Sequence, residues 1–123
     1  PWPWAGYSNS DAQLTNRRDK IKRWTRAMVK SLQLMIARKE ETYKIAQAEF
    51  GHPHDVIEGA ADVCIKAIDS ENPGGATDDA MRKNIDLTIT QPLKLCASPP
   101  LAQLVDFSIL REVHKELGIP GRK

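Results

Sequence analysis

Cys64 and His114 are the residues whose types could do nucleophilic chemistry together. A cysteine nucleophile needs a base and an orienting group close to it in space. The sequence gives this pair no geometric support. His114 lies beside charged residues at the edge of an apolar helix face, which favours a partly buried structural role for it. We expect no catalytic residue and therefore no enzyme.

A metal centre and an acid/base pair have equally weak signals. His52, His54 and Asp55 fall in one turn, but two histidines spaced two apart lack an evident fourth ligand. Asp78 and Asp79 are adjacent, so they point to different sides of a helix and suit its positive N-terminus. No phosphate-binding loop or dinucleotide glycine pattern is present in the sequence. We expect no metal and no cofactor.

The two cysteines, Cys64 and Cys96, leave two interpretations open. They are too far apart in the sequence for a zinc signature. In an oxidising compartment they could form one disulfide between two helices. As two separate thiols they would be small buried apolar residues, which is the favoured interpretation.

The elements that must position these residues are helices. A chain of 123 residues with 41% apolar and 28% charged residues suits a single globular domain. No strand pattern is convincing, so the predicted fold is all-α, with about five helices in an irregular bundle and an extended N-terminal arm. We divide the chain into an arm or crossover segment at 1–15, a helical domain at 16–118 and a fraying tail at 119–123.

The longest predicted helix begins near Asn16, a plausible N-cap, and falters near Arg38, where we expect a second helix or a kink. A turn at 11–14, capped by Ser10 or Asp11, precedes it. Its apolar face has helical spacing and consists of Ile21, Trp24, Met28, Leu32, Met35 and Ile36.

Three further helices follow the stop at Gly51. The first runs from about residue 55 to 68, the second is capped by Thr77 and ends near Thr90 before Pro92, and the last is capped by Asp106 and closed by Gly118. The predicted inner face of the first of these helices is Val56, Ile57, Ala60, Ala61, Cys64, Ile65 and Ile68. That of the second is Ala80, Met81, Asn84, Ile85, Thr88 and Ile89, and that of the last is Phe107, Leu110, Val113, His114 and Leu117.

Residues 17–39 carry nine basic side chains against Asp19 alone, although the net charge of the chain is only +2. Such a helix could contact an anionic partner such as nucleic acid. The alternative is a solvated face balanced by acidic residues elsewhere in the chain. The basic residues point in several directions around the helix, which favours solvation and makes nucleic acid an unlikely partner.

Four stretches resemble the C-terminal part of solute-binding proteins from ABC transporters of the nitrate/sulfonate/taurine and thiamine-precursor family. They are residues 6–11 with Asn16 and 21–27, residues 38–46 through Phe50-Gly51, the helical run after Pro53, and residues 104–110 through Glu116-Leu117-Gly118. The chain departs from the family where Arg17-Arg18 replaces a frequent Pro and Arg38-Lys39 replaces Asn-Pro.

The resemblance implies a non-enzymatic function in small-solute uptake, an ABC permease as partner of the full-length parent, and a periplasmic location. In this family two α/β lobes close over the ligand, and most of that pocket comes from earlier in the chain. The resemblance places only Trp4, Tyr7 and Ser8 near a former cleft, as candidate ligand-binding residues. Helix faces that lack their sheet should drive self-association into a homo-oligomer.

Overall fold

The computed structural model describes residues 6–121, and this part of the chain is all-helical, as the sequence predicts. The five expected helices are present, together with two short ones that were not predicted as separate elements. None of the helices within 6–121 has the length and apolar character needed to span a membrane. The elements are α1 (Asp11–Asn16), α2 (Arg18–Ala37), α3 (Lys39–Phe50), α4 (His54–Ala67), α5 (Asp78–Ile85), the π-helix η1 (Asp86–Thr90), α6 (Leu101–Leu104) and α7 (Ser108–Leu117).

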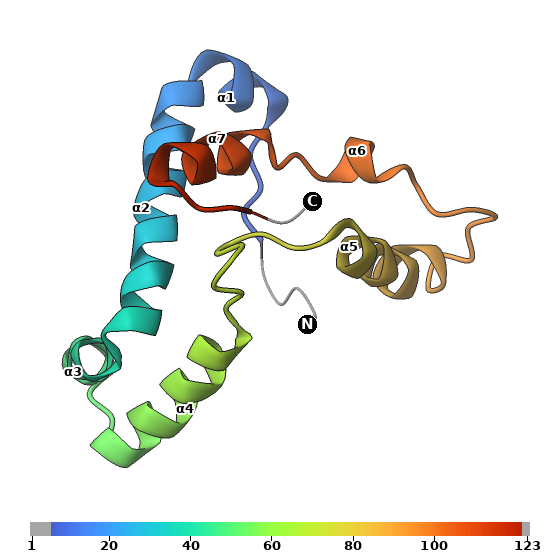
Figure 1. Ribbon diagram of the computed structural model, residues 1–123. Coiled ribbons are helices and arrows are strands. Elements are labelled where there is room, and N and C mark those ends of the chain that lie inside the picture. The colour runs from blue at the N-terminus through green and yellow to red at the C-terminus, as the bar shows by residue number, and fades with distance from the viewer. Residues whose placement is uncertain (1–5, 122–123) are drawn as a thin grey trace.

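α2 is the rod on which the other elements are arranged (Figure 1). Its 20 residues span about 30 Å. α1 and α7 pack near its N-terminal half, whereas α3 and α4 pack at its C-terminal end. α5, η1 and α6 form an arm that extends away from α2, to the right in Figure 1. The molecule is therefore open, with two groups of helices sharing one long element.

α2 forms because residues 18–37 contain neither Pro nor Gly and repeat apolar side chains at helical spacing. It stops at Arg38, whose φ of −135° and ψ of 65° are not helical, so the predicted break is confirmed. Thr25 and Val29 are the buried residues of α2, while Trp24 from the predicted face is 44% exposed. The buried stripe is turned because α7 packs against this side of the rod.

The predicted extended arm at 1–15 is wrong where it includes residues 11–15, which belong to α1. Ser10 begins that helix because its hydroxyl accepts a hydrogen bond from the backbone N–H of Gln13 at 3.3 Å. Asn16 is not the N-cap of the long helix but the last residue of α1. Arg17 takes the N-cap position of α2 and makes no side-chain capping bond.

The first hydrophobic cluster joins α2 to α7 and to the residues after α7. Its buried members are Val29, Leu110, Val113 and Ile119. The predicted inner face of α7 is confirmed, but the predicted fraying from residue 119 is wrong. Helix α7 ends in a Schellman motif, in which the N–H of Ile119 donates to the carbonyl of His114 at 2.9 Å. That turn folds Ile119 back into the cluster.

A backbone conformation and a hydrogen bond fix this C-terminal turn further. Gly118 has a φ of 68°, the left-handed conformation that the motif requires and that favours glycine. The N–H of Gly121 then donates to the carbonyl of Glu71 at 3.0 Å, which ties the segment after α7 to the loop after α4. The segment is therefore part of the core boundary rather than a loose tail.

The second hydrophobic cluster joins the C-terminal end of α2 to α3 and α4. Tyr43, Ile57 and Ile65 are buried in it, with Met35, Ile36, Ala46 and Ala61 packed around them. Only part of the predicted face of α4 is buried, because Val56, Ala60 and Cys64 are exposed. The helix therefore turns its Ile57–Ile65 side inward and leaves the other apolar side uncovered.

The arm begins at α5, where the Thr77 hydroxyl accepts a hydrogen bond from the N–H of Ala80 at 3.2 Å, so the predicted cap is confirmed. The helix then widens into η1 before Pro92. The N–H of Gln91 donates to the carbonyl of Asp86, five residues back, at 2.9 Å. The polar side chains of Asp86, Thr90, Gln91 and Ser98 bond to one another and close this end of the arm.

Candidate functional site

The structure describes two of the three residues proposed for a former ligand cleft. Trp4 lies outside the described residues. Tyr7 is 72% exposed, and its ring lies edge-on to Trp24 with the ring centroids 4.2 Å apart. Ser8 is exposed on the same extended segment. The aromatic contact anchors Tyr7 to α2, which the sequence alone did not suggest.

The other candidate chemical groups are also apart. Cys64 is exposed on α4 and His114 is buried in α7, two helices that do not touch. Cys64 and Cys96 are neither joined nor buried, so both interpretations of the cysteines are wrong. His54 Nδ1 lies 3.9 Å from a carboxylate oxygen of Glu58. Within residues 6–121 no three His, Cys, Asp or Glu side chains converge as a metal site would require.

Four ion pairs link the N-terminal half of α2 to α7. Arg18 pairs with Glu112 and Arg26 with Glu116, while Lys22 Nζ lies 3.0 Å from a Glu112 oxygen and 2.7 Å from a Glu116 oxygen. Hydrogen bonds from Arg18 and Lys22 lower the pKa of Glu112, and those from Lys22 and Arg26 lower the pKa of Glu116. The same two carboxylates raise the pKa of Lys22. These charges stabilise the helix packing.

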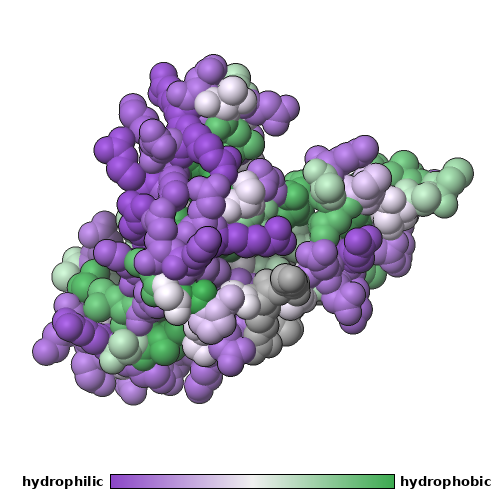
Figure 2. All heavy atoms as spheres, turned by 45° about the horizontal axis from the view of Figure 1, so that its top comes forward, coloured by the Kyte–Doolittle hydropathy of each residue, from purple (hydrophilic) through white to green (hydrophobic). Residues whose placement is uncertain are grey.

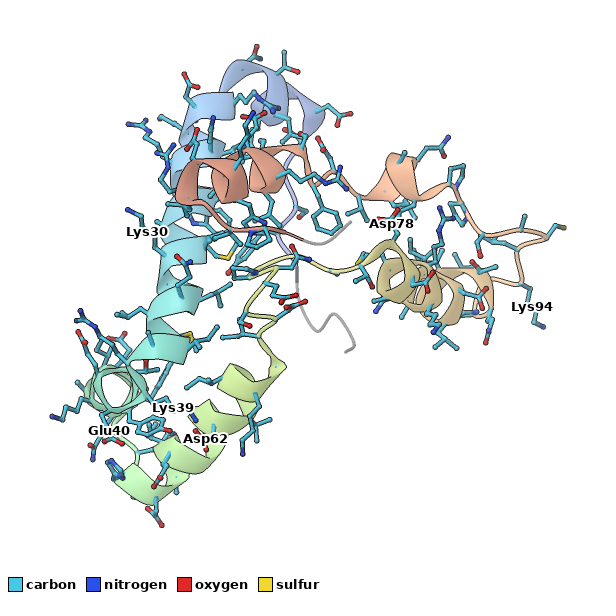
Figure 3. All side chains as sticks on the ribbon, viewed as in Figure 1. Lys30, Lys39, Glu40, Asp62, Asp78 and Lys94 are labelled. Carbon is cyan, nitrogen blue, oxygen red and sulfur yellow. The ribbon has the colours of Figure 1, made fainter. Side chains whose placement is uncertain are left out.

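A smaller polar group closes the second cluster. The Tyr43 hydroxyl donates to Asp62 Oδ1 at 2.6 Å, and Lys39 Nζ lies 3.2 Å from the same oxygen. Figure 3 shows Lys39 and Asp62 facing each other between α3 and α4. The hydrogen bond to Asp62 raises the pKa of Tyr43 to about 12, and it lowers the pKa of Asp62. This group fixes how α4 lies against α3.

An uncovered apolar stripe runs along the outer side of α4. It consists of Val56, Ala60, Val63 and Ala67, all of them exposed, at steps of four, three and four residues. These steps place the four residues on one face, next to the buried face formed by Ile57, Ala61 and Ile65. Val63 is 69% exposed and was not singled out from the sequence, although its spacing from Val56 is the signal that could have found it.

Further apolar residues are exposed along the arm and at the end of α3. They are Leu87, Leu93, Leu95 and Leu104 on the arm, and Ile45 and Phe50 on α3. Figure 2 shows hydrophobic patches at the lower left of the molecule and along the arm, while the upper part is mainly hydrophilic. Uncovered apolar area is therefore concentrated away from the α2–α7 contact.

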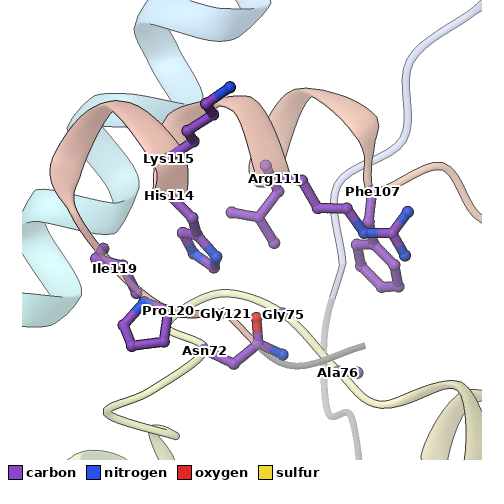
Figure 4. Close-up of a pocket in the computed structure, with 11 residues that line it drawn as sticks. Asn72, Gly75, Ala76, Phe107, Arg111, His114, Lys115, Ile119, Pro120 and Gly121 are labelled. Carbon is purple, nitrogen blue, oxygen red and sulfur yellow. The ribbon is translucent and has the colours of Figure 1, made fainter.

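A pocket of about 350 Å³ lies beneath α7 (Figure 4). It is bounded by α7, by the loop at 72–76 and by residues 119–121. His114 points from α7 into this space, and its Nε2 lies 3.0 Å from the carbonyl oxygen of Pro73. The sequence suggested a partly buried structural His114, and the structure gives it that role. Asn72 and Arg111, which also line the pocket, were not singled out from the sequence.

No family model, no curated protein and no solved structure matches this chain. What is shown is an all-α fold over residues 6–121.

Proposed function

We propose that this chain is the non-enzymatic, helical C-terminal portion of a periplasmic solute-binding protein that serves an ABC transporter. The parent protein would belong to the nitrate/sulfonate/taurine and thiamine-precursor family. It would bind a small solute between two α/β lobes and deliver it to a membrane permease. Support comes from the four motif stretches described above and, in the geometry, from one observation: α4 is apolar on two neighbouring faces and covered on one.

A helix whose apolar surface is wider than one stripe needs cover on more than one face, as in the interior of a larger protein. The inner side of α4 packs through Ile57 and Ile65 into the second cluster. Its outer side carries Val56 and Val63, which are 52% and 69% exposed. Alanine and glycine between these valines keep the outer side slim, so a flat surface such as a sheet could approach it closely. A covering lobe is what the proposed parent would supply.

The accessible surface leads to the same conclusion. A compact protein of 13.8 kDa exposes about 6,600 Å², whereas this chain exposes 8936 Å². The excess is roughly 2,300 Å², and a standard protein interface buries about 800 Å² on each partner. The open surface is thus large enough for one extensive cover. In the chain by itself, we expect a second copy to take the place of that cover.

The alternative function, an interaction module that uses the basic helix to bind an anionic partner, is less well supported by the geometry. Five of the nine basic residues at 17–39 already form ion pairs: Arg18, Lys22, Arg26, Arg38 and Lys39. Lys30 points outward, away from α4 and α7 (Figure 3). The cations without an ion pair among the described residues are Arg17, Lys20, Arg23 and Lys30, which is a small charge for binding a phosphate backbone.

Light scattering on a size-exclusion column tests the uncovered surface at two protein concentrations and two salt concentrations. We expect a dimer or larger species that persists at the higher salt, because apolar contacts are not screened. Val63→Lys should shift the mass to that of a monomer. Gln33→Lys adds the same charge at an exposed position of α2, so it serves as the control and should leave the mass unchanged. A monomeric wild-type chain that binds DNA in a salt-dependent way would favour the alternative function instead.

The assignment to a solute-binding protein needs a separate test in the source cells. Antibodies raised against this chain should detect the antigen in the periplasmic fraction, in a polypeptide that includes both lobes. Genes for a permease and an ATPase should adjoin its gene. Detection only in the cytoplasm, or only at 13.8 kDa, would contradict the proposal.

A further inference from the structure

We infer that the pocket beneath α7 binds a small organic carboxylate that has an apolar body. This inference is independent of the proposed function, since it concerns the loop after α4 and one face of α7. It depends on three polar groups that reach the pocket without a complete set of partners, and on the apolar walls between them (Figure 4).

Asn72 is the first of these groups. The residue is only 5% exposed, yet its side-chain amide makes no hydrogen bond to any other residue in the described range. Figure 4 shows the amide extending from the loop toward α7. Among the described residues no fully buried side-chain N or O atom lacks a partner, so the unbonded Asn72 amide is still reached from the pocket. A ligand atom that accepts from Nδ2 would take the place of water there.

The loop is shaped to hold Asn72 in this position. A Cβ atom on Gly75 would overlap the Asn72 amide, so any larger residue at 75 would displace it. Pro73 is fully buried beside it, and its carbonyl holds His114. The Asn-Pro-Gly-Gly segment therefore presents a defined polar group to the pocket.

His114 supplies the second group and is 3% exposed. A carbonyl oxygen can only accept, so His114 Nε2 carries the proton and donates to Pro73 at 3.0 Å. In the neutral imidazole, Nδ1 is then an acceptor, and it makes no hydrogen bond to a described residue. Nδ1 lies beside Gly121, at the edge of the pocket. It can accept a hydrogen bond from a hydroxyl or amine on the ligand.

Arg111 supplies the third group, a positive charge. Its guanidinium lies next to the ring of Phe107 in Figure 4 and forms no ion pair with any described residue. Arg111 contributes to the lowered pKa of Asp106, but that carboxylate is already bound by the backbone N–H of Ser108 at 2.7 Å. None of the described residues that line the pocket is acidic. The pocket thus favours an anion.

Apolar walls set the rest of the ligand. Phe107, Leu110, Ile119 and Pro120 line the space between the polar groups. A volume of about 350 Å³ lies at the small end of the usual range for ligand sites. A carboxylate can accept from Arg111 and Asn72 while a ring or short chain contacts these walls. Benzoate has this chemistry, and benzamide is its uncharged counterpart of nearly equal shape.

Calorimetric titration of the intact chain with benzoate and benzamide tests the inference. Benzoate should bind saturably at one site per chain, and benzamide should bind at least about tenfold more weakly, because it lacks the charge. Arg111→Gln should weaken benzoate binding by at least about tenfold, and Asn72→Leu by several-fold. In isotope-labelled protein, the benzoate-induced NMR shifts should be confined to 72–76, to α7 and to 119–121.

Lys30→Gln is the matched control. Lys30 is exposed on α2, points away from α7 in Figure 3 and does not line the pocket. This variant loses the same charge as Arg111→Gln and should change the affinity for benzoate by less than about twofold. Circular dichroism checks that each variant folds, and the exposed position of Arg111 makes its variant decisive if Asn72→Leu does not fold.

Three results would overturn the inference: no saturable benzoate binding, equal affinity for benzamide, or equal weakening by Lys30→Gln and Arg111→Gln. The last would show that benzoate responds only to the net charge of the protein. None of these results depends on oligomeric mass or on cell fractionation, so the carboxylate site and the proposed transporter function can fail separately.

Discussion

The two hydrophobic clusters on α2 are of similar size but differ in how completely the chain covers them. The first, around Val29 and Val113, is fully buried at its centre and bordered by four ion pairs and by the turn after α7. The second, around Tyr43 and Ile57, is closed on one side by α3 and α4. Beyond α4 lies the exposed stripe that includes Val63.

The difference shows how a fully covered helix contact differs from a partly covered one in this fold. In the first cluster, α7 presents apolar residues inward and charged residues at the border. In the second, α4 presents apolar residues both inward and outward. The first cluster should therefore be rigidly packed by the chain alone. The second should rearrange more easily around a cavity unless another surface covers α4.

Cavity-creating substitutions at matched positions in the two clusters should give the largest change in the free energy of unfolding. Leu110 and Ile57 are 7% and 6% exposed, so truncation to alanine removes similarly buried atoms. We expect Leu110→Ala to lower the free energy of unfolding by about 4 kcal/mol and Ile57→Ala by about 2 kcal/mol, because a site that can collapse loses less. Urea unfolding, at a concentration where one species is present, measures both. Equal losses would break the comparison.

The turn after α7 should give the next largest effect. Gly118→Ala places a side chain at a φ of 68°, and it should lower the free energy of unfolding by about 1 kcal/mol. Gly59→Ala is its control in α4, where a Cβ would meet open space. That change should raise the free energy of unfolding by roughly 0.5–1 kcal/mol, since alanine favours the helix. Thermal unfolding measures both variants. If the two melting temperatures shift in the same direction, Gly118 has no special role in the turn.

The ion pairs at the first cluster predict that the stability of the protein falls at low pH. Their partners hold the pKa of Glu112 and Glu116 below the ordinary 4.5 in the folded state. Their stabilisation is thus fully present above pH 4.5 and is lost as the pH falls through the lowered values. Unfolding measured across this range should show a smaller loss for the double variant Glu112→Gln/Glu116→Gln than for the wild type. An identical dependence in both proteins would mean that the pairs add nothing.

The smallest and most local effect concerns the second cluster. Tyr43 should titrate at about 12, and Asp62→Asn should return its pKa toward the ordinary 10.0. A raised pKa means that the stabilisation from this group is full below pH 10 and is lost as the pH rises toward 12. Absorbance titration of tyrosinate follows it, with Tyr43→Phe identifying the signal. A pKa that Asp62→Asn leaves unchanged would show that α3 and α4 are not joined through this bond.

Helical periodicity and caps were enough to predict most of the fold. Thr77, the break at Arg38 and the inner face of α7 follow from rules that act within a few residues. The N-cap at Asn16 was a local error, but the larger errors lie where distant segments meet. Ile119 could be placed only by knowing that the turn after α7 folds back onto α2, and Trp24 lost its central position because α7 packs beside it.

The candidate pocket shows the same limit more strongly. Asn72 looks like an ordinary loop residue, and Arg111 looks like one more surface cation in the sequence. They line the same pocket because α7 crosses above the loop after α4, an arrangement that no short-range pattern encodes. The second stripe of α4 was different, since its spacing is visible in the sequence once a helix apolar on two sides is considered.

The contact between α2 and α7 also sets an order of events when the protein is made. Arg18 pairs with Glu112, 94 residues later in the chain, whereas α3 and α4 are neighbours in sequence. At about 5–20 residues per second, a ribosome needs roughly 5–20 seconds to synthesise the chain between these partners. During that interval α2 is present without its partner helix. The helix made early must remain soluble until nearly the last one emerges, which makes the newborn chain a natural client for chaperones that shield apolar surface.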